Sequence, residues 1–451
     1  MFKWECLVCG FIYDEAAGMP EHDIPAGTRW EDVPDSWFCP ECGVGKADFE
    51  MVRIPADAEA SQASGAPDPV IILGSGLAGY TVARELRKLD STVAIRIVTR
   101  DGGECYSKPA LSNAFQSGRL PDQLVTFSAG QMAEQLQAQI NTYTSIDRID
   151  TDAQAVYIDG LPQRYSALVL ALGADARRPP VDGDGADAII TVNDLEDYRK
   201  LRQQLGTNSK VAILGGGLIG CEFANDLRHA GHQVSIVDRA PCLLSRLLPA
   251  EAAGEMANAL QSIGVHLQLG NAPVAVHRKH SGLELQLADG QRLEVDHVLG
   301  ATGLAPRVEL VRAAGITVSS GVVTDACLRA SARNVYALGD CAQVHDLVLP
   351  YVMPIMLQAR ALARTLAGEP TAVAYPAMPV TIKTSVLPTV VASPMANTGR
   401  WSTELAGRCD KGLATVRSIY RDDHDQMHGF VLMGASTQQR AELLKALPDW
   451  K

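Results

Sequence analysis

The chain has 451 residues, a net charge of −12, and 47% hydrophobic against 20% charged residues. A chain of this length exceeds a single hydrophobic core and predicts several domains. The acidic balance disfavours a nucleic-acid partner, and no apolar run approaches the roughly 18 residues needed to cross a bilayer, so we expect no membrane insertion. The first residues, MFKWECLVCG, lack the apolar core of a signal peptide, which predicts a cytoplasmic protein.

The N-terminal segment carries two C-x-x-C pairs, each followed by glycine: Cys6 with Cys9, and Cys39 with Cys42. Four thiolates at this spacing predict a tetrahedral metal site, and both zinc and iron accept such ligands. Residues 1–53 also hold eleven Asp or Glu against four Lys or Arg. This acidic face is either simply solvated or a docking surface for a protein partner.

Residues 54–68, IPADAEASQASGAPD, are rich in Ala, Ser and Pro without apolar periodicity, and predict a flexible linker. The segment VIILGSGLAGYTVARELR (residues 70–87) then predicts strand, tight turn and helix. In such a unit Gly74 allows the turn, Gly76 lets the backbone approach a pyrophosphate, and Gly79 lets helix and strand pack closely. The expected phosphate-binding loop comprises Gly74, Ser75, Gly76, Leu77, Ala78 and Gly79.

The same unit recurs as VAILGGGLIGCEFANDLR (residues 211–228), which is identical to the first at ten of eighteen positions. Its glycines are Gly215, Gly217 and Gly220. Two copies predict two Rossmann-like dinucleotide sites. An acidic residue that binds a ribose is expected about 20 positions later. Asp238 ends the second strand and predicts a preference for NADH over NADPH, although Arg239 beside it could accept a 2′-phosphate.

The corresponding strand of the first copy ends at Thr99, Arg100 and Asp101, where the ribose ligand is less clear. From about residue 376, the runs PVTIKT, LATVRSIY and GFVLMG predict strands, and TQQRAELLKAL predicts a helix. This pattern indicates a small α+β domain at the C-terminus.

Further motifs along the chain resemble segments of known protein families. ALGADARRP (171–179), ATGLAPR (301–307) and NVYALGDCA (334–342) resemble segments of the glutathione-reductase-type flavoprotein fold, in which the aspartate of the last motif, Asp340, binds the FAD ribityl chain. YSKPALS, GLIGCEFANDL, LPYVMPIM and MPVTIKT resemble rubredoxin reductases. The resemblance implies FAD contacts near Lys108, Ile146, Glu222, Asp340, Val352 and Lys383. It also places Glu222 beside the NAD site.

A helix beginning near Tyr351 would direct its N-terminal dipole toward the flavin. Lys108 and Glu222 are expected to form an ion pair beside the face of hydride transfer, and they are our candidate catalytic residues. The alternative is an ordinary surface lysine and an ordinary helix glutamate.

Residues 1–53, with Tyr13, Trp37 and Phe49 around the cysteines, resemble rubredoxin along their whole length. This resemblance implies that Cys6, Cys9, Cys39 and Cys42 bind one iron, and that Gly10 and Gly43 allow backbone N–H groups to point at the sulfurs. A structural zinc ribbon is the alternative.

The expected fold is therefore multidomain: a small rubredoxin-like metal module, then an α/β flavoprotein with two Rossmann domains, for FAD and NAD, and a small α+β C-terminal domain. The expected boundaries are 1–53 for the rubredoxin domain, 54–68 for the linker, 69–180 and 305–375 for the two parts of the FAD domain, 181–304 for the NAD domain and 376–451 for the last domain.

The expected function is transfer of electrons from NADH through FAD to the rubredoxin iron, and on to an acceptor protein such as a membrane alkane hydroxylase. Two other functions stay open. Cys105 precedes Pro109 by four positions and could serve a thiol-dependent NADH oxidase or peroxidase. Alternatively, a zinc-bound head could recruit the flavoenzyme to a partner.

Overall fold

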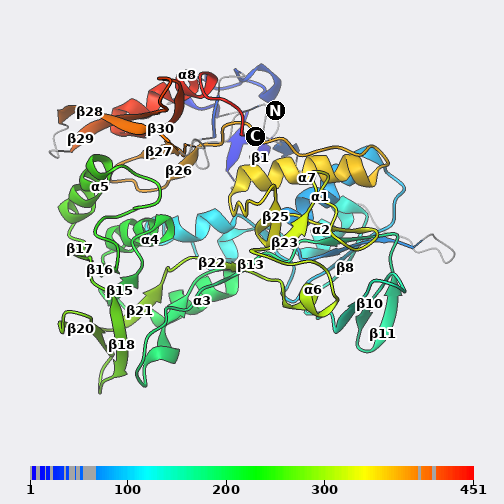
Figure 1. Ribbon diagram of the computed structural model, residues 1–451, viewed down its shortest axis with the longest axis horizontal. Helices are drawn as coiled ribbons and strands as arrows, with labels where there is room; N and C mark the ends of the chain where they lie inside the picture. The colour runs from blue at the N-terminus through cyan, green and yellow to red at the C-terminus, as the bar shows by residue number, and fades with distance from the viewer. Residues whose placement is uncertain are drawn as a thin grey trace. The chain divides into compact units, whose positions relative to one another are not determined.

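The computed structural model in Figure 1 describes most of the chain: residues 3–6, 11–15, 17–20, 24–34, 37–39, 46, 51–53, 68–394, 398–408 and 413–450. The chain forms two compact units, each assembled from segments far apart in the sequence. The first unit comprises Met1–Ser107, Gln123–Asp175 and Ala305–Tyr375, and the second comprises Lys108–Asp122, Ala176–Leu304 and Pro376–Lys451. The predicted linker falls almost entirely outside the described residues.

The N-terminal module belongs to the first unit and contains a small antiparallel sheet in the order β2-β1-β3. Its elements are β1 (Lys3–Cys6), β2 (Ile12–Asp14), β3 (Met51–Arg53) and the 3-10 turn η2 (Trp30–Asp32). Tyr13 is fully buried, and its ring lies 5.5 Å from that of Trp30, which meets Trp37 edge-on at 5.3 Å. Aromatic contacts of this kind stabilise a core that is too small for many aliphatic residues.

A parallel five-stranded sheet organises the rest of the first unit, in the order β24-β12-β4-β5-β8. All side chains of β4 and β12 are buried, as expected for strands covered on both faces. Helix α1 begins directly after β4, and α7 packs beside it (Figure 1). The strands are β4 (Val70–Leu73), β5 (Ile95–Val98), β8 (Gln139–Asn141), β12 (Ala167–Leu170) and β24 (Val335–Ala337), and the helices are α1 (Leu77–Leu89), α2 (Ala129–Leu136), α6 (Glu309–Ala313) and α7 (Val352–Leu366).

Smaller strands complete this unit: β6 (Cys105–Tyr106) with β7 (Val125–Phe127), β9 (Arg148–Asp150) with β10 (Ala155–Ile158) and β11 (Leu161–Arg164), and β23 (Val322–Thr324) with β25 (Ala342–Val344). Two short strands, β13 (Ala174–Ala176) and β22 (Leu304–Pro306), lie where the chain passes from one unit to the other.

The second unit contains another parallel five-stranded sheet, in the order β14-β21-β15-β16-β17. Helix α4 follows β15 as α1 follows β4, which is the predicted repetition of the strand–turn–helix unit. The strands are β14 (Ile190–Thr191), β15 (Lys210–Leu214), β16 (Gln233–Asp238), β17 (His266–Leu269) and β21 (His297–Gly300), and the helices are α3 (Leu195–Gln204), α4 (Leu218–His229) and α5 (Ala250–Ser262). A 3-10 segment, η4 (Lys108–Asn113), also belongs to this unit.

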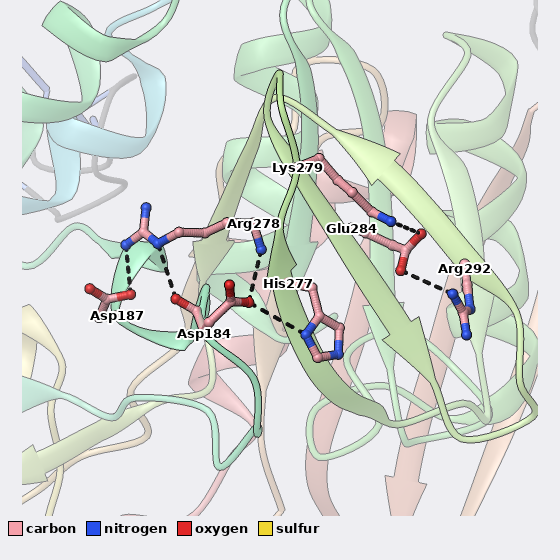
Figure 2. A network of polar contacts seen from close by, with 7 residues as sticks. All are labelled: Asp184, Asp187, His277, Arg278, Lys279, Glu284 and Arg292. Carbon is pink, nitrogen blue, oxygen red and sulfur yellow. Dashed lines mark hydrogen bonds and ion pairs between the residues drawn. The ribbon is translucent and has the colours of Figure 1, made fainter.

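An antiparallel sheet of β18 (Pro273–Arg278), β19 (Leu283–Leu287) and β20 (Arg292–Val295) carries a polar network on its surface. Glu284 accepts from Lys279 at 2.9 Å and from Arg292 at 3.3 Å (Figure 2). The hydrogen bond from Lys279 holds the pKa of Glu284 below its usual range. The other residues of Figure 2 are Asp184, Asp187, His277 and Arg278. The drawn residues bond in two groups: Asp184 and Asp187 with His277 and Arg278, and Glu284 with Lys279 and Arg292.

The C-terminal segment forms an antiparallel sheet, β26-β27-β30-β29-β28. Its elements are β26 (Val380–Ile382), β27 (Thr389–Ala392), β28 (Arg400–Arg408), β29 (Ala414–Arg421), β30 (Met427–Met433) and α8 (Arg440–Lys445). Phe430 and Leu432 are fully buried against α8 residue Leu443. The predicted α+β character is confirmed. The predicted terminal helix is shorter than expected, because Gly434–Gln439 forms a 3-10 turn before α8 begins.

Within the described ranges, every helix is too short or too polar to pass through a lipid bilayer.

Candidate functional site

The first glycine loop has the shape of a dinucleotide cradle. Gly74 has a φ of +112°, and a side chain there would come within 2.3 Å of the Ala171 carbonyl oxygen. A Cβ on Gly79 would lie 1.9 Å from the Gly74 carbonyl oxygen, whereas a Cβ on Gly76 would meet no atom within 4 Å. Two glycines are therefore required by protein packing and the third faces open space. The N-terminus of α1 behind this space attracts phosphates.

The expected ribose residues of the first loop form one hydrogen-bonded cluster. Ser75 Oγ lies 2.9 Å from Thr99 Oγ1, and both hydroxyls donate to Asp101 Oδ1, at 3.1 and 2.7 Å. The same carboxylate oxygen accepts the Gly103 N–H at 3.0 Å. Arg100 is exposed. The cluster fixes the loop relative to the end of β5, and a role of these residues in ribose binding stays a prediction.

The end of α7 supplies a second part of the expected FAD site. The helix begins at Val352 with Tyr351 as its N-cap, as the sequence predicted. Gly339 has a φ of +78°, its Cβ would come within 2.8 Å of Ala78 Cβ, and its N–H donates to Gln358 Oε1 at 2.7 Å. Asp340 follows it in a single 3-10 turn. The turn that holds Gly339 therefore packs against the first turn of α1, and the expected FAD contacts of Asp340 and Val352 stay a prediction.

A buried polar atom without a partner also fits a bound cofactor in the first unit. Ser107 is 8% exposed, and its hydroxyl has no hydrogen-bond partner within the described residues. Such an atom is costly unless a ligand or water satisfies it. Ile146 is half-buried just before β9, and Leu77 lies in the first turn of α1. These features are compatible with FAD, and the assignment of individual contacts remains a prediction.

The second glycine loop has nearly the same backbone geometry as the first. Gly215 has a φ of +115°, and its Cβ would come within 2.5 Å of the Ala301 carbonyl oxygen. A Cβ on Gly220 would lie 1.9 Å from the Gly215 carbonyl oxygen, and a Cβ on Gly217 would meet nothing within 4 Å. The second unit therefore holds its own cradle, built by the same packing rule.

Asp238 lies at the end of β16, where the sequence placed it. Its two carboxylate oxygens accept backbone N–H groups, from Gly216 at 2.5 Å and from Ala240 at 2.8 Å. The negative charge is thereby held against the glycine loop. Arg239 is exposed. A fixed carboxylate at this position repels a 2′-phosphate, which agrees with the predicted preference for NADH.

Glu222 lies on α4 and is completely buried, so its charge must be compensated by neighbours. Lys383 provides this with Nζ at 3.2 Å from Oε2 and with its backbone N–H at 2.9 Å from Oε1. Ser112 Oγ donates to Oε2 at 2.5 Å. Lys383 Nζ also donates to Ser112 Oγ and to the Pro109 carbonyl. These are the contacts that the described residues give Glu222. The expected ion pair with Lys108, which begins η4, stays a prediction.

The sequence did not identify Ser112, Asn225 or Asp226 as site residues. The segment GLIGCEFANDL contained a signal, because Glu222, Asn225 and Asp226 recur at helical spacing among residues that are otherwise apolar up to Leu227. Buried polar residues at such positions require partners, and the partners here come from segments distant in sequence. A sequence without its tertiary contacts does not reveal which segments these are.

The metal module places two of its four cysteines in the described structure. Cys6 and Cys39 are both buried, in one cluster with Tyr13 and Trp37. Cys9 and Cys42 lie outside the described residues, as does Phe49, so the complete ligand set stays a prediction. Soft thiolates in a small apolar core are a suitable environment for iron.

Cys105 lies in β6 and is half-buried. The guanidinium Nη2 of Arg84 lies 3.7 Å from its sulfur and 3.3 Å from the sulfur of Met132. The sulfur of Cys105 therefore lies beside a guanidinium, and a thiol-dependent function stays a prediction.

Comparison with known proteins agrees with this geometry. Residues 68–362 match the pyridine nucleotide-disulphide oxidoreductase family, residues 3–49 match rubredoxin, and residues 372–447 match the rubredoxin binding C-terminal domain. The first two matches imply FAD and NAD(H) for the flavoprotein part and iron for the N-terminal module.

The chain is similar to two proteins named rubredoxin-NAD(+) reductase. It is 43% identical to that of Alcanivorax borkumensis over 382 residues, which covers 84% of this chain and 98% of the relative. It is also 43% identical to that of Acinetobacter baylyi, with the same coverage of both chains. A nitric oxide reductase FlRd-NAD(+) reductase of Escherichia coli K12 is 37% identical, over 84% of this chain and 99% of that protein.

Among solved structures, the covalent putidaredoxin reductase–putidaredoxin complex aligns with a TM-score of 0.75 at 25% identity, over 85% of this chain and 94% of that chain. The NADH oxidase of Lactobacillus brevis bound to NADH shares the fold, with a TM-score of 0.75 at 16% identity over 85% and 92% of the two chains. The repeated cradles, the family matches and the relatives agree, and the chain belongs to the rubredoxin-NAD(+) reductase family of pyridine nucleotide-disulphide oxidoreductases.

Proposed function

We propose that the chain passes electrons from NADH through FAD to the iron of its own rubredoxin module. The observation that carries this proposal is that one chain contains both a rubredoxin domain, at residues 3–49, and a rubredoxin binding domain, at residues 372–447. The two relatives named above match 84% of this chain over nearly their whole length. The unmatched share is about as long as the N-terminal module with its linker.

A contact inside the first unit supports transfer within one chain. The buried cluster that holds Cys6 and Cys39 also contains Met356 of α7, and Val352 packs against it. Val352 is one of the expected FAD contacts. One buried cluster therefore includes both expected iron ligands and the first turns of α7, which gives a short path between the two expected cofactor sites.

In this proposal the second unit binds and orients the substrate. Asp238 excludes the 2′-phosphate, and the α4 N-terminus behind Gly217 receives the pyrophosphate of NADH. FAD, when bound, converts a two-electron hydride into single electrons that iron accepts. Lys108 and Glu222 are the residues that we place beside the reacting face. Their charges would hold the nicotinamide and flavin in a fixed electrostatic environment.

The next acceptor is an electron-transfer partner protein. A membrane alkane hydroxylase is our candidate, and this assignment rests on the resemblance to rubredoxin reductases alone. The acidic balance of residues 1–53 favours a docking face that carries basic residues.

Two complementary variants test whether transfer is intramolecular. Cys39→Ser removes an iron ligand and keeps both nucleotide cradles. Gly220→Val closes the NADH cradle and keeps the metal module. In stopped flow neither variant alone should show reduction of rubredoxin iron by NADH, because the first lacks an intact iron site and the second does not bind NADH. A mixture at micromolar concentration should remain below about a tenth of the wild-type rate, because a tether supplies an effective concentration of order mM.

Recovery of most of the wild-type rate in the mixture would show transfer between molecules and contradict the intramolecular proposal. Flavin content and bleaching of the flavin by NADH in Cys39→Ser confirm that this variant is a competent donor. Metal analysis of the wild type should give one iron per chain. A zinc-loaded, colourless module would overturn the electron-transfer function itself.

A further inference from the structure

Helix α4 carries three buried polar residues on one face, and they bind two segments that are distant in sequence. Glu222, Asn225 and Asp226 are each at most 1% exposed. Residues spaced by three or four positions share a helix face. The first segment runs from Lys108 to Gln116 and includes η4, and the second is the stretch from Lys383 to Val386 after β26. Both segments belong to the same unit as α4.

Asp226 holds the far end of the first segment. Its Oδ2 accepts the Phe115 N–H at 2.9 Å, and its Oδ1 accepts the Gln116 N–H at 2.7 Å. The Phe115 ring is fixed as well, since it meets Tyr198 edge-on at 5.3 Å and lies 4.7 Å below the guanidinium of Arg202. A backbone bonded at two successive N–H groups has little freedom to shift along the helix.

Asn225 holds the second segment in the same way. Its Oδ1 accepts the Val386 N–H at 3.2 Å, and its Nδ2 donates to Ser385 Oγ at 3.1 Å. Ser385 Oγ in turn lies 3.1 Å from Gln116 Oε1, which links the two segments directly. Between these bonds, Ser112 of the first segment and Lys383 of the second meet at Glu222.

We propose that Asp226 is a positioning residue: its carboxylate fixes the segment Lys108–Gln116 on α4, so that Ser112 and Pro109 meet Lys383 at the buried Glu222. This inference rests on the proposed role of Lys108 and Glu222 in the reaction of NADH with the flavin. Asp226 touches neither nucleotide in this role and acts through the segment it holds.

The burial of Asp226 makes its hydrogen bonds to the segment depend on pH. Burial raises the pKa of Asp226 to about 7, although the two N–H donors and the charges of Lys383 and Arg202 oppose the rise. The charged or titratable groups that face Asp226 are Lys383 beyond β26, Arg202 and Tyr198 on α3, and Glu222 one turn earlier on α4. A protonated carboxyl presents one hydroxyl donor toward an N–H group, so one of the two bonds is weakened below pH 7.

The raised pKa of Asp226 also determines how this residue changes the stability of the fold with pH. In the unfolded chain the pKa of this carboxyl is near its ordinary value of 3.8, well below the value in the folded protein. The contribution to stability is therefore complete at low pH and is lost as the pH rises through 7. Stability therefore falls between about pH 4 and pH 7, whereas positioning improves as the pH rises through 7, because the ionised form binds the segment better while its burial costs more.

The test uses Asp226→Asn in the flavin-loaded full-length protein. An amide accepts from one N–H and opposes the other, as the protonated acid does. In the wild type, the rate of flavin reduction by NADH should fall about fivefold from pH 8 to pH 6, the effect of one weakened hydrogen bond, with little change in KM. Asp226→Asn should show the low rate at both pH values, and Asp226→Glu should restore part of the pH dependence.

Asp197→Asn is the matched control. Asp197 lies on α3, and burial raises its pKa as well, but it accepts the N–H of Asn193 just before that helix and makes no contact with Glu222 among the described residues. The pH profile of Asp197→Asn should match that of the wild type. A wild-type profile in Asp226→Asn would overturn the proposal.

Hydrogen exchange separates this inference from the proposed function. After correction for intrinsic rates, the Phe115 and Gln116 amides should exchange about tenfold faster in Asp226→Asn than in wild type at pH 8. This readout needs no turnover, so it remains decisive even if NADH proves a poor substrate. Unchanged protection of both amides would contradict the positioning role. If the asparagine variant does not fold, the same two amides in the wild type, compared between pH 8 and pH 6, give the answer.

Discussion

The two glycine loops are alike where they approach a nucleotide and differ one turn further along the helix. Both first glycines have φ values within a few degrees of each other, +112° and +115°, and both third glycines would place a Cβ 1.9 Å from a carbonyl oxygen. In the aligned sequences Thr81 of α1 corresponds to Glu222 of α4, and Arg84 corresponds to Asn225.

These aligned positions have different neighbours. Thr81 Oγ1 lies 3.7 Å from the sulfur of Met356, and Arg84 lies between the sulfurs of Cys105 and Met132. Glu222 instead binds a lysine and a serine. Glycines thus determine that a nucleotide can bind, and the second helical turn determines which chemistry lies beside it. The first loop has the features of a cofactor holder, whereas the second is backed by charges suited to a reaction.

The largest expected effects come from closing each cradle in turn. Gly79→Ala and Gly220→Ala each force a Cβ against a carbonyl oxygen, which must displace the helix. Gly79→Ala should yield protein that has lost most of its flavin. Gly220→Ala should stay yellow and lose at least about 100-fold in kcat/KM for NADH.

Gly130→Ala on α2 and Gly254→Ala on α5 serve as controls, since their added methyl groups meet no atom closer than 3.8 Å. Flavin absorbance and NADH titrations distinguish the two cradles. If Gly220→Ala lost flavin and Gly79→Ala kept it, our assignment of the two nucleotides would be reversed.

An intermediate effect is expected at Asp238. Asp238→Ala removes the fixed negative charge at the second loop, so kcat/KM for NADPH should rise about tenfold relative to that for NADH. Asp101→Ala at the first loop should leave this ratio unchanged, because that loop is assigned to FAD. A wild type that already uses NADPH as well as NADH would show that Arg239 prevails over Asp238.

The smallest effect is expected at Cys105, which contacts the first of the two helices. Cys105→Ser should change NADH-driven reduction of a one-electron acceptor by less than about twofold, since serine preserves the size and a hydrogen-bonding atom beside Arg84. Loss of most activity in a variant that still carries its flavin would favour the thiol-dependent mechanism.

The local parts of the fold were predictable from sequence because short-range rules determine them. The apolar runs before each glycine loop are β4 and β15, Asp238 ends β16, and α7 begins next to Tyr351 as expected. The C-terminal helix was predicted too long, because periodicity does not distinguish an α-helix from the preceding 3-10 turn.

The buried charge cluster was predicted only in part. Sequence reasoning named Glu222 and Lys383 but linked Glu222 to Lys108, and it gave Ser112 and Asp226 no role. Lys383 is 161 residues from Glu222, and Ser112 is 110 residues from it. Such pairs are determined by tertiary packing, for which a single sequence carries no periodic signal.

The interleaving of the two units has a consequence for synthesis of the chain. The sheet that contains β4 is complete only when β24, at Val335–Ala337, has joined β12. At ribosomal rates of about 5–20 residues per second, roughly 8–33 s separate the emergence of β12 from that of β24. During that interval the β12 edge offers unpaired N–H and C=O groups to other nascent chains. The first half of the protein is therefore open to non-native strand pairing until β24 has been translated.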